Sequence, residues 1–228
     1  MIDCIDYVIT HKPYHVDQSD MYRKLCVGDY YELLCLSEKS GSNISEYNDR
    51  LNELTGLYWI WKNMDDEYVG LSHYRRFFVK DGKRLDRKTV ENILNHDGYD
   101  LIIHPLLELR WRVVHNISLI VGDELTIRTY DLIEHALKEK HPEYMDAFED
   151  VMRSSKFYPK NMFVCRREIM DLFCEWLFSF IIDVTDKVDV TGRSEYEKRV
   201  CGYFGETMWT VWLRKQNLKI YEMPIMTR

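Results

Sequence analysis

Two arginines and a histidine follow an apolar run near the middle of the chain. Residues 70–76 read G-L-S-H-Y-R-R, and residues 67–72 have the composition of a short buried strand. Guanidinium groups bind phosphate oxygens in a bidentate manner, and open α/β sheets bind ligands beyond the carboxyl ends of their strands. We therefore predict an anion site, at which His73, Arg75 and Arg76 would hold a phosphorylated or nucleotide-linked substrate. Ordinary surface ion pairs are the alternative for the two arginines.

A second pair of basic residues ends the predicted first strand. Residues 5–10 are rich in strand-forming side chains, and His11, Lys12 and Pro13 follow them. Because the carboxyl ends of parallel strands meet at one edge of a sheet, His11 and Lys12 are expected to face the same crevice and to line its nucleotide end. A solvated strand end is the alternative for Lys12.

A glutamate near the carboxyl end of the chain has the surroundings of a general base. Glu206 lies at the predicted start of a helix, beside the aromatic residues Tyr203 and Phe204. Transfer to a hydroxyl group needs a base, and apolar surroundings raise the pKa of a carboxyl toward neutrality. Glu206 is therefore the predicted base, with Asp65 and Asp66 as runners-up. The alternative is an acid that only stabilises the helix dipole.

The elements that would position these residues alternate between strands and helices. Strands are expected at residues 5–10, 67–72, 99–104, 161–165 and 218–221, and helices at residues 51–63, 86–95, 123–140, 142–152 and 167–184 and through Trp209 and Trp212. This order predicts an α/β fold with a mainly parallel sheet flanked by helices, in one domain over residues 1–228. Residues 31–36 fit a strand or a short helix, and residues 106–121 are interpreted as a lid.

Composition and charge restrict the partners and the compartment. The net charge of −7 argues against a nucleic-acid partner, since that binding needs a basic face. No run reaches the roughly 18 apolar residues of a membrane span, and residues 1–6 lack the basic and apolar regions of a signal peptide. We expect a cytoplasmic protein, at most in peripheral contact with the inner face of the membrane, with all six cysteines reduced. Residues 167–184 are expected to form a buried helix, with a membrane-surface contact as the alternative.

The common phosphate and metal motifs do not occur. The chain has no P-loop, no G-x-G-x-x-G, no H-E-x-x-H and no Asp-x-Asp sequence. A nucleotide-sugar enzyme without Asp-x-Asp must neutralise its diphosphate leaving group by other means, and Arg, Lys and His side chains can do so. No cofactor and no metal ligand is therefore predicted. A divalent ion, Mn²⁺ or Mg²⁺, at Asp65, Asp66 or another acid stays open as the alternative.

Several sequence blocks together resemble a bacterial family from capsular and exopolysaccharide gene clusters. They are Asn43-Ile44-Ser45, Glu53-Leu54-Thr55-x-x-Tyr58-Trp59-x-Trp61-Lys62-Asn63, Gly70-Leu71-x-His73-Tyr74-Arg75-Arg76, Asn161-Met162-Phe163 and Gly202-Tyr203-Phe204-x-Glu206. Members of this family, long labelled a domain of unknown function, are usually described as glycosyltransferases, some of them galactofuranosyltransferase-like. The match spans nearly the whole chain, and the resemblance implies a GT-A-like nucleotide-sugar fold and sugar transfer.

The residues and the resemblance together predict a glycosyltransferase of cell-surface polysaccharide synthesis. It would move a sugar from a nucleoside diphosphate donor, expected to be a UDP-sugar, to a saccharide or lipid-linked acceptor. Glu206 and His73 would be catalytic, and the residues expected to position sugar hydroxyls are Asn43, Asn52, Glu53, Asn161 and, on a mobile wall, His115. Asn52 and Glu53 alternatively only cap a helix. The competing functions are a non-catalytic nucleotide- or sugar-binding module of an assembly complex and a phosphate-ester hydrolase.

Overall fold

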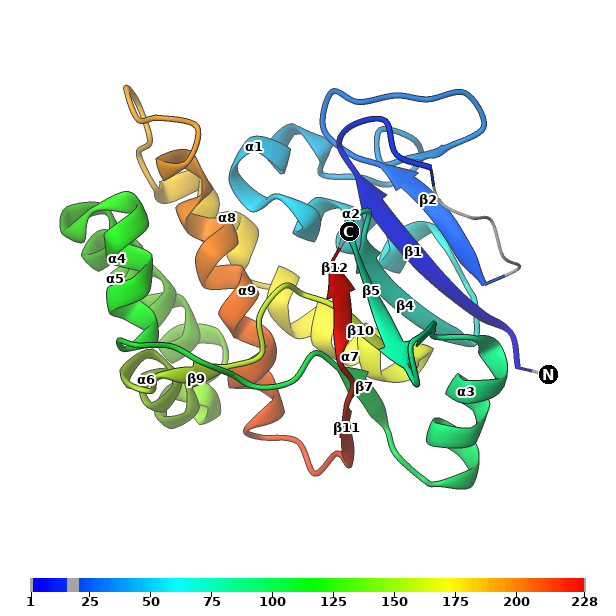
Figure 1. Ribbon diagram of the computed structural model, residues 1–228. Helices are drawn as coiled ribbons and strands as arrows, with labels where there is room; N and C mark the ends of the chain where they lie inside the picture. The colour runs from blue at the N-terminus through cyan, green and yellow to red at the C-terminus, as the bar shows by residue number, and fades with distance from the viewer. Residues whose placement is uncertain (1, 16–20, 228) are drawn as a thin grey trace.

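A computed structural model describes residues 2–15 and 21–227 of the chain (Figure 1). Its central sheet has the strand order β11-β7-β10-β4-β1-β2-β3. The strands on this path are β1 Cys4–Thr10, β2 Tyr22–Cys26, β3 Leu36–Ser37, β4 Tyr68–His73, β7 Leu101–Ile103, β10 Phe163–Arg166 and β11 Ile220–Glu222. β1 pairs in parallel with β2 and β4, whereas β10 is antiparallel to both of its neighbours, β4 and β7. The sheet is therefore mainly parallel, as the sequence predicts.

Shorter strands lie off the main path of the sheet and extend it from the end of β4. β5 Arg76–Lys80 turns back from the end of β4 and pairs with β6 Lys83–Arg84 and β12 Ile225–Thr227. β8 Leu107–Glu108 and β9 Lys156–Phe157 form a separate antiparallel pair.

Helices cover both faces of the sheet (Figure 1). They are α1 Asn48–Leu51, α2 Glu53–Asn63, α3 Arg87–Glu91, α4 Val113–Val121, α5 Asp123–Lys140, α6 Met145–Arg153, α7 Arg167–Phe178, α8 Ile181–Lys187 and α9 Val200–Leu213. Side chains alternate between the two faces of β1, so Tyr7 and Ile9 enter the larger core with α2, α7 and α9, whereas Cys4 and Val8 enter a smaller core beside α3. Both faces of the central strand are thus buried.

The structure corrects several boundaries. The predicted helix at residues 51–63 is interrupted at Asn52, which has a positive φ of 53°. The helix predicted at residues 167–184 is divided into α7 and α8; α7 packs against β4, β10 and α9, and α8 packs against α5 and α9. Among the described residues, no helix is long and apolar enough to cross a membrane.

Two other segments differ from the prediction. The second strand is β2, whereas most of residues 31–36 form a loop; β2 was not predicted, because Arg23 and Lys24 lie at its centre. The segment interpreted as a lid, residues 106–121, contains β8 and α4, and α4 packs against α5, α6 and α9. Not all cysteines are reduced, since Cys26 and Cys35 form a disulfide; the other four are free and buried.

Candidate active site

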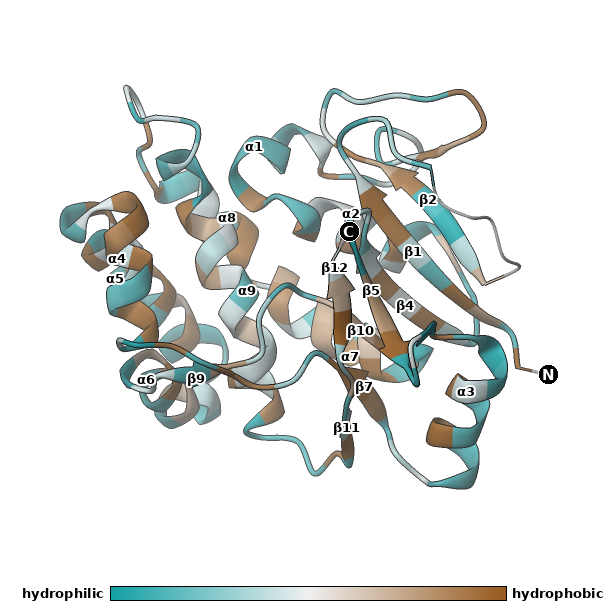
Figure 2. Ribbon diagram, viewed as in Figure 1, coloured by the Kyte–Doolittle hydropathy of each residue, from teal (hydrophilic) through white to brown (hydrophobic). Residues whose placement is uncertain are grey.

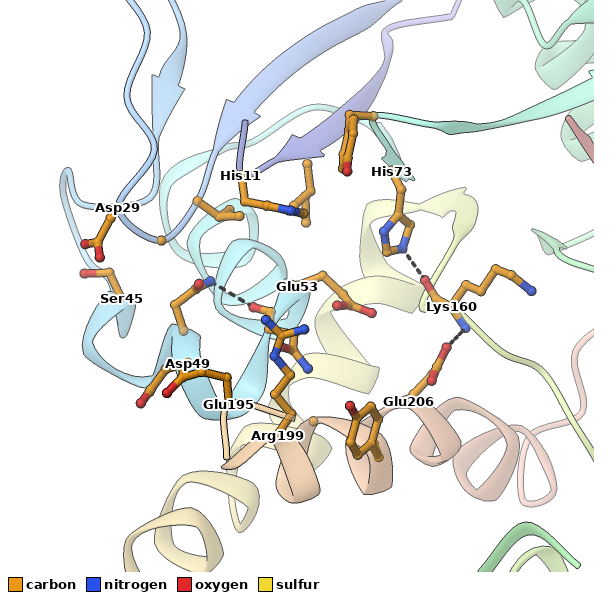
Figure 3. A pocket seen from close by; sticks show the side chains of 18 of the residues that line it. His11, Asp29, Ser45, Asp49, Glu53, His73, Lys160, Glu195, Arg199 and Glu206 are labelled. Atoms are coloured by element: carbon orange, nitrogen blue, oxygen red, sulfur yellow. Dashed lines mark hydrogen bonds between the residues drawn. The ribbon is translucent and has the colours of Figure 1, made fainter. Parts of the chain in front are cut away.

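A pocket of about 930 Å³ opens at the carboxyl ends of β1 and β4 (Figure 3). His11 follows β1 and His73 ends β4, so both predicted strand termini reach the same cavity. α1, α2 and α9 supply the opposite wall. The charged residues of the lining are the cations Lys39, Arg75, Arg76, Lys160 and Arg199 and the acids Asp29, Glu46, Asp49, Glu53, Glu195 and Glu206. The pocket thus places cations and carboxylates around one space.

Two glycines let α9 approach α1 and α2 closely enough to bring two carboxylates together. A Cβ at Gly205 would lie 2.4 Å from Cδ1 of Leu54, and a Cβ at Gly202 would lie 2.5 Å from Nδ2 of Asn52. A larger residue at either position would therefore require the side chain of Leu54 or Asn52, or the helix itself, to shift. Because Glu53 begins α2 and Glu206 follows Gly205 on α9, this close packing makes both glutamates part of the pocket lining.

Burial and mutual repulsion change how these two glutamates ionise. Burial, followed by the charge of Glu53, raises the pKa of Glu206 to about 7. Burial also raises the pKa of Glu53, whose Oε1 accepts a hydrogen bond of 3.2 Å from Nδ2 of Asn161. Near neutral pH the pair therefore holds a proton that two isolated carboxylates would have lost.

The peptide groups of Lys160 connect His73 to Glu206. The Nε2–H of His73 donates to the carbonyl of Lys160 at 2.6 Å, and the backbone N–H of Lys160 donates to Oε1 of Glu206 (Figure 3). Lys160 and Asn161 both have positive φ, 74° and 49°, which residues other than glycine seldom adopt. This unusual turn orients the carboxylate of Glu206 through the backbone rather than through a side chain.

Burial is the largest cause that lowers the pKa of both His73 and His11, and neighbouring cations also lower it, whereas the hydrogen bond to Lys160 and the charge of Glu206 act in the opposite direction at His73. The lowered pKa favours the uncharged form of both rings. Nε2 of His73 is protonated, because it donates a hydrogen bond to the carbonyl of Lys160. In the uncharged ring Nδ1 is therefore unprotonated and can accept a hydrogen bond. The positive charge of the pocket therefore comes from its arginines and lysines, and His73 serves to hold the Lys160 turn.

The arginines after β4 remain available to a ligand. Neither Arg75 nor Arg76 forms an ion pair with any residue that the structure describes, so the surface-pair alternative finds no support there. The Arg75 guanidinium lies 4.9 Å from the ring centroid of Tyr74, and Nζ of Lys12 lies 5.5 Å from the same centroid. The ring of Tyr74 thus contacts two cations, one that follows β1 and one that follows β4, at one end of the pocket.

A buried network fixes the wall formed by α1 and α2. The carboxylate of Glu38 accepts from the backbone N–H of Gly28 and from the hydroxyl of Thr55, and burial raises its pKa. Nδ2 of Asn48 donates both to Thr55 and to the carbonyl of Asn52. These bonds satisfy the backbone around the break at Asn52 and hold Gly28 against the cavity.

Seven of the predicted site residues line the pocket together, and four do not. Those in the lining are His11, Asn52, Glu53, His73, Arg75, Arg76 and Glu206. Lys12 lies beside it over Tyr74, and Asn161 is buried behind Glu53. The side chain of Asn43 instead binds Ser45 and Gly41 within its own loop, and the ring of His115 contacts Trp111 at the start of α4. The last two therefore have no place in the site described here.

The acids proposed as runners-up lie at the opposite end of the sheet. Asp65 and Asp66 precede β4, whereas the pocket follows its last residue. Oδ2 of Asp66 accepts a hydrogen bond of 2.5 Å from the hydroxyl of Tyr7, which gives it a structural role. Across the described ranges, no group of three or more His, Cys, Asp or Glu side chains is arranged to hold a metal ion.

Sequence reasoning missed several residues of the lining. Lys160 and Arg199 add two cations, and Tyr203 and Asn48 add hydrogen-bonding groups. Arg199 lies at the end of a charged segment that resembles any solvated loop, and Lys160 precedes a predicted strand. The only sequence signal for Lys160 was its place between Pro159 and the Asn161-Met162-Phe163 block.

Comparison with known proteins places this chain in a family. The model of the family described as a domain of unknown function, DUF4422, matches residues 6–217, so the chain belongs to that family. The chain is also similar to a solved structure described as the apo form of the bifunctional glycosyltransferase WbbM, with 26% identity and a TM-score of 0.83. The match covers 99% of this chain and 45% of that one, so the chain spans less than half of the WbbM chain. The fold is accordingly α/β and GT-A-like. A comparison with curated proteins gives no match.

Proposed function

We propose that the protein is a glycosyltransferase of cell-surface polysaccharide synthesis, moving a sugar from a nucleoside diphosphate donor to a saccharide or lipid-linked acceptor. One observation carries the proposal: Glu206, with a pKa of about 7, shares a pocket with Arg75 and Arg76 at the carboxyl end of β4. The likeness to a bifunctional glycosyltransferase supports the same class of reaction.

The acid–base step follows from the state of Glu206. Its carboxylate takes the proton from an acceptor hydroxyl as that oxygen bonds to the anomeric carbon of the donor. A base with a pKa near the working pH combines a usable ionised fraction with a real affinity for the proton. Attack from the side opposite the leaving group inverts the anomeric centre. The N–H of Lys160 keeps the carboxylate pointed at the acceptor.

The leaving group needs positive charge on the other side of the sugar. As the bond from the anomeric carbon to the phosphate oxygen breaks, its electron pair stays on the diphosphate. Arg76, partly buried, and Arg75, exposed, lie where this charge develops, and Lys160 and Arg199 add to the field. These side chains would take the place of an Asp-x-Asp metal site, with His11 and Lys12 toward the nucleotide.

The sugar itself would lie between the two glutamates. Glu53, fixed by Asn161, and Asn52, fixed at the break between α1 and α2, offer oxygens and an amide to sugar hydroxyls. Because Glu53 is partly buried and shares a proton with Glu206, it can donate as well as accept a hydrogen bond. A UDP-sugar is the donor we propose to test first.

The test is a thermal-shift screen with nucleoside diphosphates and their sugars, in EDTA and in Mn²⁺ or Mg²⁺. A ligand at about 100 times its dissociation constant stabilises the folded state by about 2.7 kcal/mol. Stabilisation by one nucleotide in EDTA, followed by acceptor-dependent release of the nucleoside diphosphate, would support the proposal. A shift only with metal would contradict the arginine site. Binding without turnover would favour a binding module, and release of free phosphate would favour a hydrolase.

A further inference from the structure

The loop between β2 and β3 presents large apolar side chains to solvent. Tyr31, Leu33 and Leu34 are 67%, 77% and 95% exposed, and no large apolar residue in the described part of the chain is more exposed than Leu34. Figure 2 shows one part of the loop that follows β2 in brown, as a hydrophobic stretch at the edge of the molecule, whereas the rest of the loop is more hydrophilic. Single exposed apolar residues are common, but three within four positions mark a contact surface.

The backbone conformation of the loop makes the two leucines still more unusual. The N–H of Cys35 donates to the carbonyl of Glu32 at 3.1 Å, which closes a turn with Leu33 and Leu34 at its centre. Leu34 has φ of 68° at the third position of this turn, where glycine or asparagine is favoured. A leucine at this position has an unfavourable backbone conformation and an exposed side chain, so it does not stabilise the folded chain. We therefore infer that Leu34 contacts a partner outside the chain.

The turn is anchored and cannot easily fold back onto the protein. The disulfide between Cys26 and Cys35 joins the two ends of the loop. The carboxylate of Glu32 accepts from Nζ of Lys24 and from the hydroxyl of Tyr30, both at 2.7 Å. These bonds hold the base of the turn while its apolar tip stays exposed.

The loop borders the mouth of the active-site pocket. Gly28 and Asp29, which lead into it, belong to the pocket lining. On the other side, the segment before α9 contributes Glu195 and Arg199 to the lining and exposes 68% of Tyr196. In Figure 1 both segments project toward the same side of the molecule, at the top of the view. The two segments that carry these exposed apolar and aromatic residues therefore both adjoin the pocket lining.

We propose that residues 29–35 dock the protein on a lipid bilayer, with Leu33 and Leu34 in the acyl region and Tyr30 and Tyr31 at the level of the headgroups. Tyrosine prefers the membrane interface and leucine its apolar side, so the order of side chains along the loop fits a bilayer. Tyr31 is 67% exposed, so its ring is accessible to the headgroup region.

The charges around the loop permit this approach. Asp29 pairs with Lys39 at 3.0 Å and Glu32 with Lys24 at 2.7 Å, so the base of the loop carries balanced charge. An anionic surface would neither repel the loop nor hold it by charge alone, and apolar insertion supplies the affinity. Docking on a bilayer would bring the pocket to a lipid-linked acceptor. Only this role of the docking rests on the proposed function.

The test is co-sedimentation with vesicles of phosphatidylethanolamine and phosphatidylglycerol, without donor or acceptor. We expect the wild type to bind and the double variant Leu33→Ser, Leu34→Asn to lose about tenfold or more in partitioning, since two leucines leave the acyl region. Asparagine suits a positive φ, so thermal unfolding should be unchanged or improved. The matched control is Leu119→Asn on α4, which removes a leucine that is 64% exposed and should not alter binding.

The possible outcomes separate docking from catalysis. Absence of vesicle binding by the wild type, or equal binding by the double variant, would overturn the proposal. Loss of self-association in the double variant with unchanged vesicle binding would show that a second copy covers the loop, and would also overturn it. If vesicle binding behaves as expected while no donor is turned over, docking stands and the glycosyltransferase proposal fails. The double variant should retain turnover on a soluble saccharide acceptor.

Discussion

Burial, followed by the charge of Glu53 across the pocket, raises the pKa of Glu206; Glu53 lies at the start of α2 and Glu206 in the middle of α9. The repulsion exists because Gly202 and Gly205 let the two helices approach closely. The same packing that stabilises the helical layer therefore creates a destabilised pair of acids. Such a conflict between stability and local chemistry is typical of a site preserved for function.

The first prediction concerns stability and pH. The folded-state pKa of Glu206 is raised from 4.5 to about 7, so the stability associated with its proton is fully present below about 4.5 and is lost as pH rises through 7. Glu206→Gln should therefore raise the free energy of unfolding by about 1–3 kcal/mol at pH 8 and by much less at pH 5. Urea denaturation at the two pH values measures this difference. Equal effects at both would mean that Glu206 ionises normally.

The second prediction ranks the two arginines. Arg76→Ala should reduce transfer more than Arg75→Ala, because Arg76 is partly buried and interacts electrostatically with Glu53, His73 and Lys160, whereas Arg75 is exposed. A loss of about 10²–10³-fold is typical for a donor that stabilises developing charge. Steady-state kinetics on one donor measure both variants.

Arg153→Ala is the control for these arginines, since Arg153 pairs with Glu149 on α6 outside the pocket lining. Its loss should leave kcat and KM unchanged. If Arg76→Ala behaves like Arg153→Ala, the diphosphate lies elsewhere.

The third prediction tests the close packing of α9 on α2. Gly205→Ala should destabilise the protein by about 1–3 kcal/mol, because the new Cβ would lie 2.4 Å from Cδ1 of Leu54. The same substitution in a Leu54→Ala background should cost clearly less, since the clashing atom is gone. Denaturant unfolding of the four proteins in this cycle gives the coupling energy. Additive effects would show that the helices do not meet at this point.

The fourth prediction concerns the thiols. Alkylation of the unfolded protein without reductant should modify the four free cysteines, Cys4, Cys165, Cys174 and Cys201, and reduction should add two more labels. Intact mass gives the count directly. Six labels before reduction would show that Cys26 and Cys35 are not joined, and the loop that they close would then lack this anchor.

Much of the fold could be predicted from the sequence, because the pattern of apolar residues within a segment indicates whether that segment forms a strand or a helix. The strands β1, β4 and β7 are buried on both faces and therefore appear as apolar runs, and α5 shows its helical period and begins and ends at the predicted residues. The reversed direction of β10 was not predicted, since strand direction depends on pairing across the sheet rather than on local composition. The break at Asn52 likewise depends on its contacts with Asn48 and α9.

The site residues that could be predicted are those that lie at the ends of strands. His11, His73, Arg75 and Arg76 follow strands that the sequence reveals, so their meeting at one edge followed from topology. Lys160 lies in a turn whose conformation is set by its distant partners His73 and Glu206, and Arg199 ends a short 3-10 helix, Glu197–Arg199, directly before α9. Asn43 and His115 were expected from residue type, yet their contacts are local to their own segments.

Turnover by Glu206→Gln tests the central claim most directly. Release of nucleoside diphosphate from a donor that the wild type uses should fall by about 10²–10⁴-fold, because an amide cannot accept the proton of the acceptor hydroxyl. Donor affinity, measured by calorimetry, should stay within a few-fold, and wild-type kcat should rise with pH to a plateau above about 7. A Glu206→Gln variant that transfers sugar at the wild-type rate would contradict the account.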